Sequence, residues 1–414
     1  MTRPDRRRAH RGGVRIAIVA ESFLPLMNGV THSILRVLEH LEDQGYDVLV
    51  IAPSTYAVAE FVGPAEVVHG ATVHRVPAVP LAGYTNVRVA MGGVYRVKRI
   101  LADYAPDVVH LASPFILGWR AVQAAHQLGI PTIAIYQTEV PSYAARYGVP
   151  FLENWAWNRV ENIHLLATRT LVPSTFALNQ LRGRGIPRVG MWRRGVDTAR
   201  FSPEKRDAGW RATVAPGGER IIGYVGRLAI EKQVEDLAAL ANVPNTRLVI
   251  VGDGPQKSAL QEALPDAVFT GFLGGEELAK AVASFDLFVH PGEFETFCQT
   301  IQEAMASGVP VVATGRGGPL DLVENSRTGW LYQPGDLAGF RARVMDLMGD
   351  DAKRRAFATT AHASVQARTW PVLSAELVRQ YQSVIAGEPL TETVDTKSRR
   401  PVVEPAQTKS GASL

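Results

Sequence analysis

The residues best suited to chemistry lie in the second half of the chain, in four short segments. Gly226-Arg227-Leu228 and Lys232 come directly after the apolar run Ile221–Val225. Ligands of open α/β sheets sit beyond the carboxyl ends of the strands. Two cations at such an end can grip a diphosphate, the arginine as a fork and the lysine as a point charge. Alternatively, Arg227 and Lys232 lie on an ordinary solvent-exposed turn and bind no ligand.

A second segment holds two glutamates, Glu295 and Glu303, on either side of an expected loop-to-helix junction. Free amides at a helix start, near Phe297, Cys298 and Gln299, can donate hydrogen bonds to a phosphate. In the loop, Glu295 can hydrogen-bond sugar hydroxyls, while Glu303 in the helix can accept both hydroxyls of a ribose. The alternative is that these glutamates only complement the helix dipole.

The other two segments are turns rich in glycine. Gly252-Asp253-Gly254-Pro255 follows one predicted strand, and Arg316-Gly317-Gly318-Pro319 follows another. The glycines can let a ligand approach the backbone, but the same residues also suit an ordinary tight turn or strand-to-helix loop.

Two stretches of alternating apolar runs and helical patterns must position these residues. A βαβα order predicts a parallel sheet with helices on both faces. Helices are expected at 119–128, 151–167, 234–241 and 276–284. Strands are expected at 14–20, 47–52, 73–76, 108–111, 132–136 and 170–173, and again at 221–225, 247–251, 267–269, 287–290 and 309–313. The sequence therefore predicts two Rossmann-like domains.

Composition agrees with a two-domain enzyme that remains in the cytosol. The chain has 414 residues, 46% hydrophobic and 20% charged, and it has no run of about 18 apolar residues that could span a bilayer. Its single cysteine, Cys298, excludes an internal disulfide and a cysteine-based metal cluster. The short apolar run at 14–20 fits a first strand better than a signal peptide.

The positive charge is concentrated at the N-terminus. Residues 1–15 hold six arginines and one aspartate, a net +5, whereas the whole chain carries +4. We expect residues 1–13 to form a disordered basic tail and residues 387–414 a second disordered tail. A basic arm can bind anionic lipid or nucleic acid, although a solvated extension is the simpler interpretation.

Several motifs of other nucleotide enzymes are missing. The sequence contains neither G-x-G-x-x-G nor a P-loop, which makes a nicotinamide dehydrogenase a poor alternative. It also has no D-x-D pair of the kind that holds a divalent ion in metal-dependent glycosyltransferases. We therefore expect fixed cations to replace a metal, with no cofactor required.

Taken together, these residues resemble glycosyltransferase family 4, the retaining enzymes with the two-domain GT-B fold. Asn28-Gly29-Val30, Arg194-Gly195-Val196-Asp197 and the E-x7-E pair at Glu295 and Glu303 carry the resemblance. It implies two Rossmann-like domains, 14–195 on the acceptor side and 196–370 for the nucleotide sugar, with parallel sheets facing an interdomain cleft. A C-terminal helix at 371–386 would pack back on the first domain.

The resemblance also assigns roles to residues. Gly29 would lie against the donor diphosphate, Arg227 and Lys232 would bind its phosphates, and Glu295 and Glu303 would contact the transferred sugar and the ribose. The segment 269–272 would flank the base, which brings in Phe272, and Glu295 would join the two cations as a catalytic residue. Cys298 departs from the family, in which glycine is common at this position.

Within the family, segments 18–25, 109–114 and 136–141 resemble GDP-mannose-dependent α-mannosyltransferases acting on glucuronosyl diacylglycerol, and also sulfoquinovosyl diacylglycerol synthases that use a UDP sugar. Gln137 and Thr138 would then lie on the acceptor side. His110 is a candidate catalytic residue, with a buried core histidine as the alternative. A protein that binds or epimerises a nucleotide sugar without transferring it is the alternative of another class.

A lipid acceptor implies contact with the inner face of the plasma membrane. The stretch 88–100 combines Arg88, Arg96, Lys98 and Arg99 with apolar residues, which is typical of a basic amphipathic segment on an anionic membrane. An ordinary surface helix over the sheet explains the same pattern. No nucleic-acid partner is expected.

Overall fold

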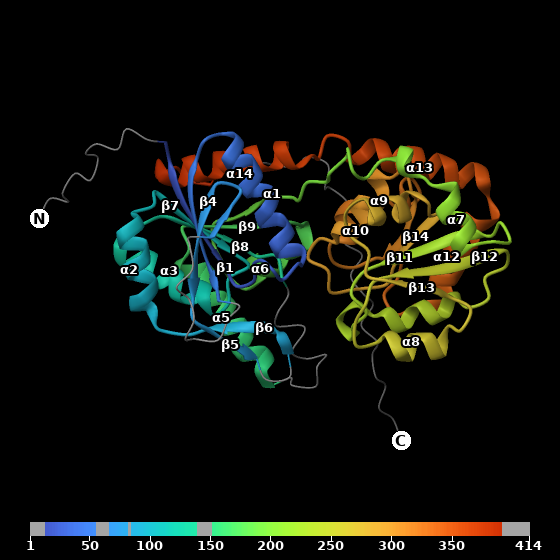
Figure 1. The fold of residues 1–414 in the computed structure, drawn as a ribbon, viewed down its shortest axis with the longest axis horizontal. Coiled ribbons are helices and arrows are strands. Elements are labelled where there is room, and N and C mark those ends of the chain that lie inside the picture. Colours follow the sequence, from blue (N-terminus) through green and yellow to red (C-terminus); the bar gives the residue numbers. More distant parts are fainter. Residues whose placement is uncertain (1–12, 55–65, 82–83, 139–150, 391–414) are drawn as a thin grey trace, which may run out of the picture.

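The structure, a computed structural model, describes residues 13–54, 66–81, 84–138 and 151–390. Two α/β lobes lie side by side, each built on its own mainly parallel sheet (Figure 1). This arrangement confirms the predicted fold class. Most of the predicted tails, 1–12 and 391–414, lies outside the described residues.

The N-terminal lobe has an eight-stranded sheet in the order β10-β9-β8-β7-β1-β2-β4-β3. Every pairing is parallel except that of β3 with β4. The central strands are buried along their length because helices cover both faces. The strands are β1 (Arg15–Ala20), β2 (Asp47–Pro53), β3 (Glu66–Val68), β4 (Ala71–Val76), β7 (Val108–Ala112), β8 (Thr132–Ile135), β9 (Arg169–Val172) and β10 (Val189–Met191).

Helices and a hairpin complete this lobe. The hairpin joins β5 (Ala78–Leu81) to β6 (Tyr84–Ala90). The helices are α1 (Gly29–Asp43), α2 (Val94–Tyr104), α3 (Leu117–Leu128), α5 (Phe151–Leu166) and α6 (Thr175–Gly183). Helix α1 begins after Asn28, whose side chain accepts hydrogen bonds from the amides of Val30 and Thr31.

The C-terminal lobe has a six-stranded, fully parallel sheet in the order β13-β12-β11-β14-β15-β16. Neighbouring strands β11 and β14 are far apart in sequence, so the loops that follow them meet at one edge of the sheet. The strands are β11 (Arg220–Val225), β12 (Thr246–Val251), β13 (Val268–Gly271), β14 (Leu287–His290), β15 (Val311–Thr314) and β16 (Gly329–Tyr332).

One predicted helix of this lobe is wrong in type. Residues 234–241 were expected to form an α-helix, but Val234–Leu240 (η3) is a 3₁₀ helix bounded by Gln233 and Asn242, both with positive φ. The other helical segments are η1 (Pro203–Lys205), η2 (Ile230–Lys232), α7 (Ala208–Val214), α8 (Lys257–Ala263), α9 (Gly275–Ala283), α10 (Gln299–Ala306), α11 (Pro319–Leu322), α12 (Leu337–Gly349) and α13 (Asp351–Val365).

The chain crosses between the lobes twice. The first crossing follows β10, and the second leads into α14 (Trp370–Ile385), which lies beside α1 along the N-terminal lobe (Figure 1). Leu377 and Tyr381 of α14 are buried in the core of that lobe. The two crossings touch, since the Val196 amide donates to the Arg368 carbonyl. None of the described helices has the length and apolarity that a membrane crossing needs.

Candidate active site

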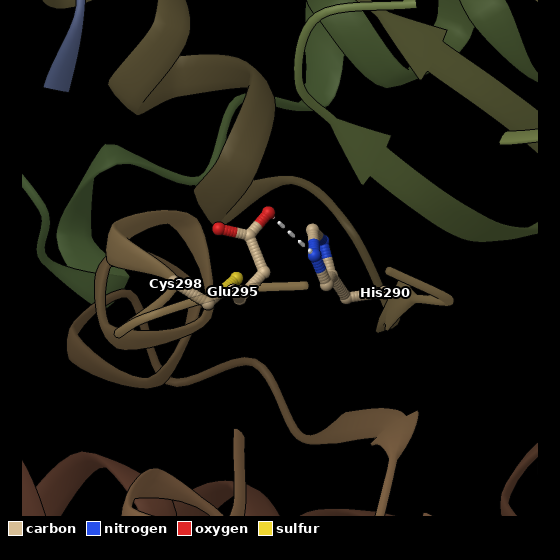
Figure 2. A group of neighbouring side chains, drawn as sticks. All are labelled: His290, Glu295 and Cys298. Atoms are coloured by element: carbon tan, nitrogen blue, oxygen red, sulfur yellow. Dashed lines mark hydrogen bonds and ion pairs between the residues drawn. The ribbon is translucent and has the colours of Figure 1, made fainter. Parts of the chain in front are cut away.

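A compact charged cluster lies at the edge where β11 and β14 end. Lys232, at the end of η2 after β11, places its Nζ 2.6 Å from Oε1 of Glu295. His290, the last residue of β14, places Nε2 3.2 Å from the same oxygen, and the Glu295 carboxylate points at the imidazole in Figure 2. Because β11 and β14 are neighbours, residues distant in sequence meet here.

The cluster carries net positive charge at neutral pH. Burial opposes ionisation of Glu295, but the nearby Lys232 and His290 hold the pKa of its carboxyl well below the usual range. Burial likewise opposes the charge on His290, yet Cys298 and Glu295 together raise its pKa to about 9. One carboxylate therefore faces two cations. The excess positive charge favours an arriving anion, such as a diphosphate.

Arg227 lies after β11, on the same loop as Lys232. Its Nη1 is 3.6 Å from Oε1 of Glu231, and the arginine side chain is about half exposed (55%) whereas that of Glu231 is buried. The guanidinium of Arg227 is therefore accessible to a ligand.

Helix α10 begins beside the cluster with its first turn uncapped by any side chain. The residue before it, Cys298, has φ 75° and ψ 77°, a left-handed conformation that glycine adopts without penalty. This geometry explains why glycine suits the position. The helix starts at Gln299, the last of the three positions near which free amides were expected. Phe297 is buried in the core and holds the loop that leads into α10 in place.

Glu303 lies in the second turn of α10 and is 8% exposed. Burial raises the pKa of its carboxyl to about 8, with a hydrogen bond from Gln299 and the charge of Arg200 opposing the shift. The carboxyl is therefore mostly protonated at pH 7 and can both donate to and accept from a hydroxyl. That chemistry suits the predicted contact with a ribose.

The two glycine-rich turns serve the protein backbone. A Cβ at Gly252 would lie 1.9 Å from the Gly226 carbonyl oxygen, and one at Gly254 would lie 2.3 Å from that of Leu228. A Cβ at Gly318 would lie 2.3 Å from the Phe297 carbonyl oxygen. These glycines let the turns pack against the segments that carry Arg227 and Glu295, a supporting role that spacing alone did not reveal.

Residues of the N-terminal lobe reach the same place. Oγ1 of Thr296 donates to the Gln137 carbonyl at 2.9 Å, and Nη2 of Arg194 donates to Gln137 Oε1 at 2.5 Å. A Cβ at Gly29 would lie 3.1 Å from Arg194 Nη1. Thr138 accepts a hydrogen bond from Ser113 at 2.7 Å. Gly29 and Gln137 therefore both contact Arg194.

His110 lies apart from these residues. Its ring is buried, and Nδ1 is 2.6 Å from the Tyr381 hydroxyl of α14. Burial lowers the pKa of His110 to about 3, so the ring is neutral. No contact among the described residues joins it to the Glu295 cluster. Nε2 of the ring has no hydrogen-bond partner among the described residues. The burial agrees with the core-histidine alternative, while the catalytic role of His110 stays a prediction.

Two further predictions remain untested. Phe272, which was expected to flank a base, follows β13 and is 77% exposed. Segment 139–141, part of the resemblance to lipid-modifying enzymes, lies outside the described residues.

Sequence reasoning missed His290 and gave Arg194 no role. The signal for His290 was its place at the end of a predicted strand, five residues before Glu295. One nitrogen, oxygen and sulfur of His290, Glu295 and Cys298 lie within 4.8 Å of one another, a set that could hold a zinc-like ion (Figure 2). The Lys232 ammonium beside the same carboxylate oxygen opposes a second cation there.

Comparisons with known proteins match both lobes. The profile described as "Glycosyltransferase Family 4" matches residues 27–200, and "Glycosyl transferases group 1" matches residues 207–363. A "GDP-mannose-dependent alpha-mannosyltransferase" of Mycobacterium tuberculosis (strain CDC 1551 / Oshkosh) is 48% identical over 90% of this chain and 97% of its own length. The protein of the same description from Mycolicibacterium smegmatis is 50% identical over 90% and 98%.

More distant similarity is found to a plant enzyme and to solved structures. "Sulfoquinovosyl transferase SQD2" of Arabidopsis thaliana is 30% identical over 90% of this chain and 74% of its own length. Among solved structures, a sucrose-phosphate synthase from Thermosynechococcus elongatus superposes with a TM-score of 0.75 over 91% of this chain and 100% of that one. At 22% identity, this last likeness supports the fold alone.

Proposed function

Because the chain belongs to glycosyltransferase family 4, we propose that it is a retaining, GDP-mannose-dependent α-mannosyltransferase acting on a membrane glycolipid of the glucuronosyl diacylglycerol type. The identity of 48–50% to enzymes described as GDP-mannose-dependent, over nearly their full length, carries the proposal. That the chain is a glycosyltransferase follows from the family itself.

The cluster at Glu295 supplies the electrostatics that such a transfer needs. Breaking the bond between the anomeric carbon and phosphate leaves negative charge on the diphosphate. Lys232, Arg227 and the uncapped amides of α10 are available to stabilise that charge, and preorganised donors of this kind are often the largest catalytic contribution. The ionised Glu295 can then hold a sugar hydroxyl, and the diphosphate itself can take the proton of the acceptor during front-face attack.

These fixed cations lead us to propose that transfer needs no metal ion. Activity should survive EDTA. Loss of activity that Mn²⁺ restores would contradict this part of the proposal.

A surface of the N-terminal lobe can meet the membrane. Tyr95 of α2 is 79% exposed, with Arg96 and Arg99 exposed beside it. On α5, which packs on α3, Trp155 is 47% exposed. The predicted amphipathic stretch is only partly available, because Val97 is buried and Val94 and Ile100 are partly buried in the lobe. We propose that this aromatic and basic surface makes peripheral contact with anionic lipid at the inner face of the membrane.

A UDP-sugar-dependent diacylglycerol glycosyltransferase is the second candidate, favoured by the 30% identity to the Arabidopsis relative. Thermal unfolding with GDP, UDP and ADP separates the two. A ligand at 100 times its Kd stabilises the folded form by about 2.7 kcal/mol. We expect GDP to raise Tm most, and a larger shift with UDP would favour the alternative.

Transfer itself is tested with GDP-mannose and glucuronosyl diacylglycerol in mixed micelles. We expect GDP release that depends on the acceptor and a product with the α configuration by NMR. Release of GDP at the same rate without acceptor would contradict the transfer. A β product would contradict retention.

A further inference from the structure

Arg194 is a buried cation that makes no ion pair with any described residue. Its side chain is 7% exposed, and among the described residues its guanidinium makes one hydrogen bond, to the neutral amide of Gln137. Nε has no partner, and no carboxylate lies within ion-pair distance in the described part of the chain. Burial lowers the pKa of Arg194 to about 10, with the charge of Glu295 opposing the shift, so the guanidinium remains charged at neutral pH. Buried charges are normally paired.

Neighbouring arginines differ in this respect. Arg36 donates to Asp197 at 2.9 Å, and Arg200 lies 3.9 Å from the same carboxylate. Asp197 therefore balances those two side chains, whereas the carboxylate that acts on Arg194, that of Glu295, lies beyond ion-pair distance and is already paired with Lys232. His32 reports the resulting positive potential: burial and the charges of Arg36, Arg194 and Arg200 lower its pKa to about 4.

The position of Arg194 is fixed from both lobes. Its backbone carbonyl accepts from Gln302 of α10 at 3.2 Å, and the next carbonyl, of Gly195, accepts from Gln299 at 3.0 Å. A Cβ at Gly195 would lie 2.5 Å from Cα of Trp370, so the chain here is closely packed. From this clamped backbone the side chain extends to Gln137 and Gly29 of the N-terminal lobe.

A second source of positive potential, the N-terminus of α1, lies beside the Arg194 guanidinium. Nη1 faces the first turn of α1, a 15-residue helix with no acidic residue in that turn. The Asn28 cap engages the amides of Val30 and Thr31 but not that of Gly29. A helix N-terminus and a guanidinium disfavour each other, and both favour an anion between them.

We propose that Arg194, with Gln137 and the start of α1, forms a subsite for an anionic group of the substrate, and that this group is a carboxylate on the acceptor sugar. The guanidinium fork matches a carboxylate with two parallel hydrogen bonds. The resemblance places Gly29 against the donor diphosphate, so this subsite adjoins the donor. The diphosphate already has Arg227, Lys232 and α10 in the other lobe, whereas the hydrogen bond of Arg194 goes to Gln137, a residue expected on the acceptor side. This inference rests on the proposed transfer to an acidic glycolipid, which it deepens.

The test compares acceptors that differ only in this carboxylate. Wild type, Arg194→Gln and Arg194→Lys are assayed with glucuronosyl and glucosyl diacylglycerol, and Arg327→Gln, an exposed arginine paired with Glu324, is the control. A lost hydrogen bond to a charged group is expected to cost Arg194→Gln roughly 10- to 100-fold in kcat/KM for the acidic acceptor. Turnover of the neutral acceptor and the KM for donor should be unchanged, with partial rescue by Arg194→Lys.

Three results would overturn the subsite. Equal loss with both acceptors together with a raised donor KM would assign Arg194 to the diphosphate. Equal loss with a lower Tm would indicate a structural role, whereas removal of an unpaired buried charge should leave Tm unchanged or raise it. Wild-type kinetics in Arg194→Gln would exclude any role.

A binding experiment separates this inference from the proposed function. Saturation-transfer NMR measures binding of methyl glucuronoside and methyl glucoside in the presence of GDP. We expect wild type to prefer the glucuronoside and Arg194→Gln to lose that preference. If wild type transfers to neither lipid yet keeps this preference, the proposed acceptor lipid is wrong while the carboxylate subsite stands. An equal response to both glycosides would overturn the subsite.

Discussion

At the scale of single residues, the contact between Lys232 and Glu295 joins catalysis to donor binding. The 2.6 Å ion pair keeps Glu295 ionised, while the same ammonium faces the place proposed for the leaving diphosphate. A donor would therefore share Lys232 with Glu295 rather than displace it. Removing the lysine should weaken both charge stabilisation and the orientation of the transferred sugar.

We predict that Lys232→Ala lowers kcat by roughly 10²- to 10³-fold, by analogy with loss of one preorganised electrostatic donor. Steady-state kinetics with GDP-mannose measures the effect. Lys280→Ala, which removes a partly exposed lysine paired with Glu277 on α9, serves as the matched control and should retain full turnover. Near-normal kcat in Lys232→Ala would remove this lysine from the mechanism.

Glu303 gives a prediction about stability and pH. Its carboxyl has a pKa of about 8 when folded, raised by burial from an ordinary 4.5, so the folded protein holds a proton that the unfolded chain releases. The contribution of the neutral carboxyl is fully present below about pH 4.5 and is lost as pH rises toward 8, at about 1.4 kcal/mol per pKa unit.

We therefore expect Glu303→Gln to be more stable than wild type by several kcal/mol at pH 8, with the difference disappearing near pH 4.5. Urea unfolding across this range measures it, and Glu324→Gln, at an exposed position, is the control. The variant should also bind GDP more weakly if Glu303 contacts the ribose. A stability difference that does not change with pH would show that Glu303 is ionised in the folded protein.

At the scale of elements, the start of α10 depends on an unusual backbone conformation. Cys298 adopts φ 75° immediately before the helix, and its side chain is only 5% exposed. A left-handed residue with a Cβ costs about 1–2 kcal/mol, which burial of the small thiol partly offsets. The turn therefore selects against large side chains, and it aims the amides of α10 at the Glu295 cluster.

We predict that Cys298→Gly changes the free energy of unfolding by no more than about 1 kcal/mol and keeps kcat within roughly threefold, because relief of strain offsets lost burial. Cys298→Val should lose both stability and activity, since a β-branched residue resists positive φ. Urea unfolding and kinetics measure the pair. Inactive Cys298→Gly with an unchanged fold would show that the thiol itself takes part.

Strong apolar patterns in the sequence predicted most strands and helices. Short elements and contacts between residues distant in sequence were not predicted. Apolar runs such as 108–111 and 221–225 are buried on both faces, so they predict strands without knowledge of their neighbours. The short strand β16 has too few residues to show a period. The segment η3 showed a helical pattern, but the pattern did not reveal that the helix is of the 3₁₀ type. Within the site, the pairing of Lys232 with Glu295 depends on strand order. The burial of His110 depends on Tyr381, 271 residues later.

At the scale of the whole molecule, both crossings between the lobes run past the candidate site. Arg194 and Asp197 lie on the first crossing, and the close approach of Gly195 to Trp370 ties it to the second. The backbone that carries Arg194 also accepts hydrogen bonds from α10. A movement of one lobe against the other would therefore shift the donor and acceptor sides relative to each other, while Arg194 moves with α10.

Charge distribution over the whole chain gives the last prediction. Residues 1–13 hold five arginines and one aspartate, a net +4, which equals the net charge of the complete chain, so deleting them leaves a formally neutral protein. Each basic residue near an anionic membrane is worth about 1 kcal/mol. We expect the deletion to reduce partitioning to anionic vesicles by roughly 10²- to 10³-fold, with residual binding through Tyr95 and Trp155.

Turnover in neutral detergent micelles should not change. Co-sedimentation at low and high salt measures binding. Undiminished binding would place the membrane contact on the folded lobe alone, and lost micellar turnover would bring residues 1–13 into catalysis.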